Sequence, residues 1–151
     1  MLVNQSRNDE LAEALITGIR DARLESKIVL FKSAAMYSDD FWNPIWHSPN
    51  PLLSQDLSER INFANQSALD LFGENIFGTP SIDLVPDDYG LRKQRAEAFK
   101  EVIETGVPKY FENSPRIIED GELGLVTGWA FRYHLNRGYS IGALLLPYSQ
   151  T

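Results

Sequence analysis

The last third of the chain alternates apolar and polar residues in the way that antiparallel strands do. Residues Lys109 to Ile118 have an extended pattern, and Asp120-Gly121 is a strong hairpin signal after them. A long alternating strand follows and ends at the turn Asn136-Arg137-Gly138. The chain then predicts a last strand from Tyr139 to Tyr148. We therefore expect three consecutive antiparallel strands in this region.

Two longer segments repeat their apolar residues at helical spacing. The first runs from about Asn8 to Met36 and could divide into two helices. The second, Tyr89 to Thr105, follows Asp87-Asp88, which suits a helix start, and it ends at Gly106. The residues expected on its buried side are Leu91, Ala98, Phe99, Val102 and Ile103.

The middle of the chain predicts a short strand that turns at once into a short helix. Ile61 to Ala64 alternates as a half-buried strand, Asn65 can cap the helix that follows, and Gly73 can end it. Before this unit, Ile45 to His47 could be a very short strand, and Leu52 to Arg60 is polar enough to be irregular. After it, Thr79 to Leu84 predicts a short turn or helix.

The order of elements is helix, short strand, strand, helices and then three strands, which indicates an α+β fold. This order resembles PAS domains, a family of sensory and protein-interaction modules. The resemblance implies a PAS-like five-stranded antiparallel sheet with short helices on one face and an N-terminal flanking helix. It covers roughly Ile45 to Tyr148, so we expect an N-terminal helical flank over residues 1–44 and a PAS-like domain over residues 45–151.

Within PAS-like sequences the chain looks most like the MEKHLA group. The matching pieces are His47-Ser48-Pro49, Phe63-Ala64-Asn65, Ala68-Leu69-Asp70-Leu71-Phe72, Pro80-Ser81 and the helix between Gly90 and Gly106. The chain departs from the group in lacking an arginine after Pro80-Ser81 and in matching weakly over Tyr110–Gly121.

Composition narrows the class of protein. The chain has 151 residues, 43% of them apolar, which is typical of one soluble globular domain. It has no cysteine, no secretory signal and no apolar run near the roughly 18 residues of a membrane span. We therefore expect a cytoplasmic protein without a membrane partner. The net charge is −7, and the sequence shows no basic face of the kind that binds nucleic acid. We therefore expect no nucleic-acid partner.

Catalytic and metal-binding patterns are missing from the sequence. His47 and His134 are the only histidines, and no G-x-S-x-G nucleophile motif occurs. The two histidines lie far apart in the sequence and do not have the i, i+4 spacing of metal ligands on a helix. We expect no catalytic residue, no metal ligand and no enzymatic activity. The alternative is a small enzyme of the ketosteroid-isomerase type, which would need a buried carboxylate with a raised pKa.

The resemblance to PAS domains limits the types of cofactor that the chain could bind. Light-sensing PAS domains with a flavin–cysteine adduct, and those with a cysteine-linked chromophore, are excluded because the chain has no cysteine. Haem is disfavoured because the helix Tyr89 to Thr105 carries no axial histidine, which leaves only His47 or His134. The remaining alternatives are a non-covalent flavin or another small organic ligand.

An aromatic set marks the predicted ligand site. PAS domains often hold ligands between the sheet and the helices, and such pockets are apolar with a few polar groups. The predicted ligand-binding residues are Phe63, Tyr110, Trp129, Phe131 and Tyr133, with Asn65 and Thr127 as polar groups. The alternative is that these aromatic residues fill the core or contact a partner.

The function we expect is that of a stand-alone PAS-like sensory or signalling module that binds a small ligand or a protein partner and acts through self-association. The N-terminal helix could pack on its own domain or also form a homodimer. No kinase, cyclase or DNA-binding segment follows Tyr148, so we expect the output to pass to a separate partner. A purely structural interaction domain with no ligand is the main alternative.

Overall fold

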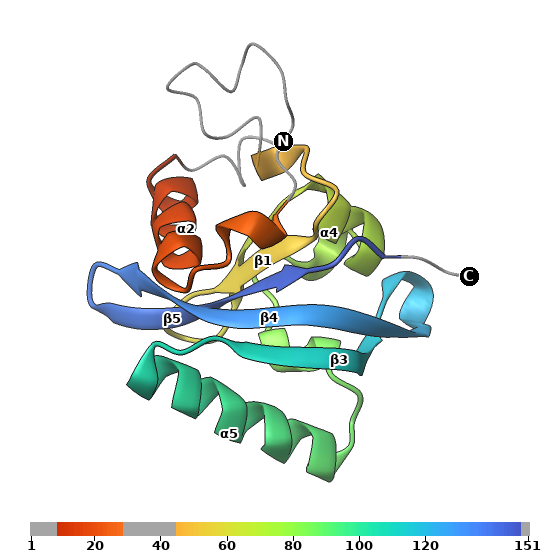
Figure 1. Ribbon diagram of the computed structural model, residues 1–151. Coiled ribbons are helices and arrows are strands. Elements are labelled where there is room, and N and C mark those ends of the chain that lie inside the picture. The colour runs from red at the N-terminus through yellow and green to blue at the C-terminus, as the bar shows by residue number, and fades with distance from the viewer. Residues whose placement is uncertain (1–8, 29–44, 149–151) are drawn as a thin grey trace.

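The computed structural model describes residues 9–28 and 45–148 (Figure 1). Five strands form one antiparallel sheet in the order β2-β1-β5-β4-β3. The strands are β1 (Leu52–Gln55), β2 (Ile61–Ala64), β3 (Lys109–Ile117), β4 (Leu123–Leu135) and β5 (Gly138–Leu145). The structure confirms the α+β fold with a five-stranded antiparallel sheet that we expect from the sequence.

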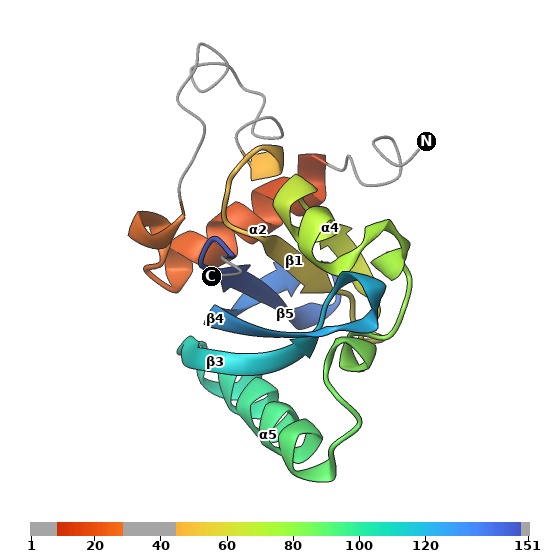
Figure 2. The ribbon, with the colours of Figure 1, turned by 90° about the vertical axis from the view of Figure 1, so that its right-hand side faces the viewer.

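Within residues 9–28 and 45–148, three complete α-helices accompany the sheet, α2 (Asp9–Asp21), α4 (Gln66–Phe72) and α5 (Tyr89–Thr105). Figures 1 and 2 show α5 along one side of the sheet, next to β3, and α2 on the other side. Short 3-10 turns complete the chain at Glu25–Lys27, Glu74–Ile76, Ser81–Leu84 and Glu119–Gly121.

The two faces of the sheet are distinguished by alternate residues of β4. Ala130 packs with Val102 of α5. Its neighbours Phe131 and Tyr133 lie against Gly18 of α2, where a Cβ added to the glycine would come within 3.2 Å of Phe131 and 2.8 Å of Tyr133. Since successive side chains of a strand point to opposite faces, α5 and α2 cover opposite faces of the sheet.

The predicted limits of α5 are confirmed, and the residues that cap the two ends of the helix explain them. The Asp88 carboxylate accepts a hydrogen bond from the Leu91 amide at 3.0 Å, as a helix N-cap does. Gly106 ends the helix with φ of 74°, a left-handed conformation that glycine adopts at little cost.

Asn65 caps α4, as predicted, and also ties the helix to its surroundings. Its Oδ1 accepts from the amides of Ala68 at 3.1 Å and Leu52 at 2.9 Å. Its Nδ2 donates to the carbonyls of Ile45 at 3.0 Å and Asn50 at 2.9 Å. The side chain is wholly buried, so one residue joins α4, β1 and the segment before β1.

The first strand was predicted at the wrong place. Ile45 and Trp46 form a helical turn, whereas Leu52–Gln55, expected to be irregular, is β1. All four residues of β1 are buried, because the strand lies between β2 and β5. A strand buried on both faces has no alternation of apolar and polar residues to reveal it.

The N-terminal helix is present as α2, which ends at Asp21. Leu15 and Ile19 are almost wholly buried, so the described part of the apolar stripe packs on its own sheet. After α2 the predicted helical region continues only as a turn and the 3-10 helix Glu25–Lys27, and residues 29–36 lie outside the described residues.

Candidate ligand-binding site

A cavity of about 670 Å³ lies between α5 and the sheet. Its floor is formed by buried apolar residues of β1, β2, β4 and β5. Residues of β3, the short turn Ser81–Leu84 and the end of α4 contribute to its walls. The buried apolar residues that line it include Leu53, Ile61, Phe72, Val126, Ala130, Ile141 and Leu145. Its size and apolar lining are those of a small-molecule site.

The cavity exists because α5 touches the sheet closely only near its C-terminal end. Val102 is wholly buried with Ala130 and Ile141. Leu91 and Ala98, which precede it on the same side of the helix, are only half-buried and line the cavity. The apolar side of α5 predicted from sequence is therefore correctly oriented, but most of it faces the cavity.

A cluster of polar side chains lies on the cavity wall. Gln55 of β1 and Ser81 are both buried, and the Ser81 hydroxyl donates a short hydrogen bond to Gln55 Oε1. Arg95 of α5 reaches both residues: its Nη2 donates to Ser81 Oγ at 2.5 Å and to Gln55 Oε1 at 3.4 Å. Three separate segments thus meet at one guanidinium.

A second guanidinium enters the same cavity from β3. Arg116 Nη1 donates to Ser114 Oγ at 2.6 Å and to the Pro115 carbonyl at 2.8 Å. Each arginine also lies over an aromatic ring within cation–π distance: Arg95 Cζ is 4.2 Å from the centroid of Phe99, and Arg116 Cζ is 5.5 Å from that of Phe111.

Both arginines are partly desolvated. Burial, with a further contribution from the charge of Arg116, lowers the pKa of Arg95 to about 10. The carboxylate of Glu59 opposes this shift, and burial alone lowers the pKa of Arg116. Among the described residues, neither guanidinium has an ion pair with a carboxylate.

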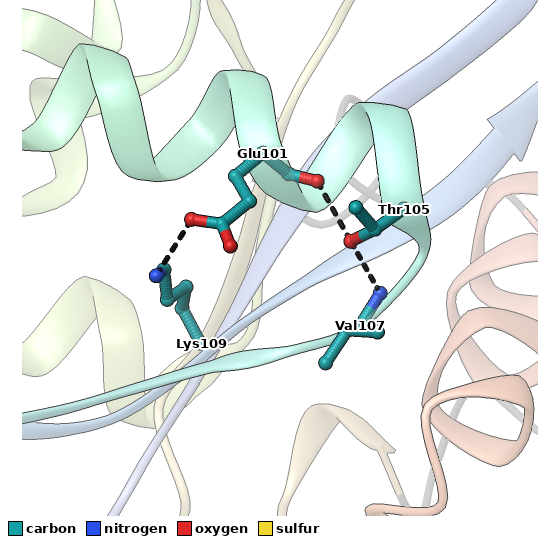
Figure 3. Close-up of polar contacts among 4 residues, drawn as sticks. All are labelled: Glu101, Thr105, Val107 and Lys109. Atoms are coloured by element: carbon teal, nitrogen blue, oxygen red, sulfur yellow. Dashed lines mark hydrogen bonds and ion pairs between the residues drawn. The ribbon is translucent and has the colours of Figure 1, made fainter.

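Solvent reaches the cavity between α5 and β3, since the exposed lining residues come from these two elements. At the end of the opening, Lys109 Nζ lies 2.7 Å from Glu101 Oε2 and joins the two elements (Figure 3). The Thr105 hydroxyl donates to the Glu101 carbonyl at 2.8 Å and accepts from the Val107 amide at 3.1 Å. The connection from α5 to β3 is fixed there by side-chain contacts.

Most of the aromatic residues predicted to bind a ligand lie away from this cavity. Phe131 and Tyr133 are wholly buried on the α2 face of β4. Trp129 shares their side of the strand, and Lys27 lies 5.5 Å from its ring centroid. The Tyr133 hydroxyl donates to the Gln55 carbonyl at 2.6 Å. Phe131 and Tyr133 form the packing under α2, and the role of all three aromatic residues as ligand contacts stays a prediction.

The other predicted residues are dispersed. Tyr110 borders the cavity, but its ring lies 5.3 Å from that of Trp129, on the opposite face. Thr127 Oγ1 accepts from the Asn113 amide at 3.0 Å, at the irregularity in the pairing of β3 with β4. Phe63 and Asn65 are wholly buried and do not line the cavity. Only Tyr110 of the predicted set therefore borders it.

Sequence reasoning missed Arg95, Arg116, Gln55 and Ser81. One signal was available, because Arg95 falls at the position between Leu91 and Ala98 on the apolar stripe of α5. A charged residue inside an apolar stripe points to a polar group facing the interior. The other three belong to segments whose convergence the sequence does not reveal.

The described residues contain neither a metal-binding cluster nor a membrane-spanning helix. No group of three or more His, Cys, Asp or Glu side chains in residues 9–28 and 45–148 is arranged to hold a metal ion. None of the helices described there is long and apolar enough to cross a bilayer. His134 packs edge-on against Tyr139 with ring centroids 5.2 Å apart, and it does not line the cavity.

Comparisons with known proteins agree on the fold. The sequence matches no protein-family model and no curated protein. The structure is similar to a PAS domain from Colwellia psychrerythraea, with a TM-score of 0.58 and 15% identity, over 68% of this chain and 89% of that one. It is also similar to the PAS domain of nitrogen regulation protein NR(II) from Vibrio parahaemolyticus, with a TM-score of 0.51 and 14% identity, over 68% and 93% of the two chains.

A third similar structure is the VqmA dimer of Vibrio cholerae, with a TM-score of 0.54 and 16% identity, over 70% of this chain and 50% of that one. VqmA has also been solved bound to DPO. At these identities the similarity shows a shared fold, and the chain has the fold of PAS domains.

Proposed function

We propose that this protein is a PAS-type sensory module that binds a small organic molecule in the cavity between α5 and the sheet. The observation that carries the proposal is the cavity of about 670 Å³, whose apolar floor and polar wall suit a small ligand. The PAS fold supports a signalling role, and VqmA, which has a similar structure, has been solved bound to DPO.

A physical connection links the cavity to the opposite face. The side chain of Gln55 accepts hydrogen bonds from Ser81 and Arg95 at the cavity. Its backbone carbonyl accepts from Tyr133, which packs under α2. A ligand that moves the Gln55 side chain would therefore alter the support of α2, provided that it binds the two arrangements with different affinity.

Mass spectrometry of the purified full chain tests the proposal. Under native conditions we expect a bound low-mass molecule, and under denaturing conditions its release. Ala98→Trp should remove it, because Ala98 lines the cavity and a large ring would occupy the space. Ala96→Trp is the matched control, since Ala96 is exposed on the same helix and does not line the cavity.

Two outcomes oppose the proposal. Protein purified from several growth conditions with no retained molecule would favour the alternative of a purely structural interaction domain. Equal retention by the two tryptophan variants would place the ligand outside this cavity.

The proposal includes assignment to the MEKHLA group and self-association. The described part of α2 directs polar residues such as Glu10, Glu13 and Thr17 outward, while its apolar stripe is buried. We place the self-contact instead on Leu123 and Leu125 of β4, residues that are 65% and 58% exposed. Light scattering after size exclusion should show a dimer that Leu125→Glu converts to monomer, and a wild-type monomer would remove this part of the proposal.

An enzyme of the ketosteroid-isomerase type gains no support from the cavity. That chemistry needs a carboxylate held inside an apolar site. The carboxylates that line this cavity, Glu97, Glu101 and Glu112, are all exposed.

A further inference from the structure

Two arginines with spare hydrogen-bond donors share the cavity. A guanidinium carries five N–H donors. The hydrogen bonds of Arg95 use Nη2, and those of Arg116 use Nη1. Nε and one terminal nitrogen of each residue have no hydrogen-bond partner among the described residues.

The two partly buried guanidiniums lack a carboxylate in ion-pair contact among the described residues, and only the charge of Glu59 partly offsets that of Arg95. Charged groups taken out of water are normally paired, because desolvation costs more than a neutral hydrogen bond returns. Arg95 and Arg116 are close enough for one charge to lower the pKa of the other. No described carboxylate forms an ion pair with either. An anion between the two guanidiniums would offset both the desolvation and the mutual repulsion.

We propose that the cavity binds a small monocarboxylate with an apolar body, its carboxylate held by Arg95 and Arg116 and its body on the apolar floor. This inference rests on the proposed function and names the ligand class for that site. A planar carboxylate matches the forked donors of a guanidinium and can accept two parallel hydrogen bonds from it. Ser81 and Gln55 orient Arg95 for this contact.

The charges around the opening argue for one carboxylate rather than two. Glu97, Glu101 and Glu112 line the exposed part of the cavity, and Lys109 is already paired with Glu101. A second anionic group at the open end of the ligand would face these carboxylates. The buried floor, with residues such as Val126 and Leu145, instead suits a hydrocarbon or aromatic body.

Calorimetric titration with octanoate and with its neutral amide, octanamide, tests the inference on the full chain. We expect octanoate to bind roughly tenfold or more tightly than octanamide, as expected for charge-assisted hydrogen bonds. Arg95→Gln and Arg116→Gln should each reduce octanoate affinity by a similar factor and change octanamide affinity little. Arg95→Lys should restore only part of the affinity, because it keeps the charge and loses the fork.

Lys93→Gln is the matched control, because Lys93 is exposed on α5 and does not line the cavity. It removes the same unit of charge and should leave octanoate affinity unchanged. Ala98→Trp should weaken both probes, since it blocks the space that both would use.

The outcomes separate the two proposals. Equal affinity for the two probes, an octanoate preference that survives both arginine variants, or no octanoate binding would overturn the carboxylate inference. Loss of octanamide binding in Ala98→Trp, or of a retained neutral molecule in the mass measurement, would still support the cavity as a ligand site. An equal loss of octanoate affinity in Lys93→Gln would show general attraction to positive charge and would also overturn the inference.

Discussion

Val102 of α5 packs against Ala130 of β4, and both side chains are buried. This contact holds the C-terminal end of α5 on the sheet, next to Gly106 where the helix ends. Toward its other end, half-buried Ala98 and Leu91 face the cavity instead. The closest contact between helix and sheet and the candidate ligand site thus lie side by side on one element.

Val102→Ala should lower the free energy of unfolding by about 2 kcal/mol, because it removes two buried methyl groups and leaves a void. Urea denaturation followed by circular dichroism measures the change. Val107→Ala is the control, since Val107 is 63% exposed, and its effect should stay within about 0.5 kcal/mol. Equal losses in the two variants would contradict the anchoring role of Val102.

Asn65→Ala should cost about 3 kcal/mol of unfolding free energy, because it removes a helix cap and leaves buried backbone groups without partners. Asp88→Ala, at the N-cap of α5, should cost only about 1 kcal/mol because its hydrogen bond is exposed. The comparison separates a cap that also joins strands from a cap alone. A cost at Asn65 no larger than that at Asp88 would show that its contacts to Leu52, Ile45 and Asn50 add nothing.

Gly18→Ala should destabilise the protein although alanine is the better helix former. A Cβ at this position would lie 2.8 Å from both the Arg132 carbonyl and Tyr133 Cβ, so α2 would have to move off the sheet. We expect a loss of about 1 to 3 kcal/mol, as for an overpacked core. Gly90→Ala in α5 is the control, because its nearest contact is the Asp88 side chain at 3.3 Å, and its melting temperature should change little or rise.

The buried hydroxyl of Tyr133 should make the free energy of unfolding fall at alkaline pH. Burial raises the pKa of its hydroxyl above the usual tyrosine value of about 10. Above about pH 10 the unfolded chain releases this proton while the folded chain retains it, so the unfolded state binds fewer protons and stability falls as pH rises. Urea denaturation at pH 9 and pH 11 should show a smaller fall for Tyr133→Phe than for the wild type. Equal falls would mean that this hydroxyl ionises alike in both states.

The sequence predicts well those elements whose signals are local. Asp88, Gly106 and the apolar spacing between them determine α5, and the alternation in β4 determines a strand with two distinct faces. Neither signal says which face of β4 meets which helix. Aromatic residues suit pockets, so the sequence favours the face of β4 that carries Trp129, Phe131 and Tyr133 as the ligand face. The structure packs Phe131 and Tyr133 of that face against Gly18 of α2.

The polar wall of the cavity could not be predicted because it is assembled from distant segments. Gln55 belongs to a strand buried on both sides, which carries no period-two pattern. Arg116 lies beyond an irregularity in the pairing of β3 with β4, and that irregularity determines which residues of β3 face α5. Only Arg95, on the apolar stripe of α5, gave a readable sign.

The most direct test of the ligand site is methyl NMR of the full chain titrated with octanoate and octanamide. We predict shifts concentrated at the methyl groups of Val126, Ile141 and Leu145, which line the cavity. Shifts concentrated instead at Leu144, which pairs in register with Trp129, and at Leu15 of α2 would place the ligand on the opposite face and contradict the account.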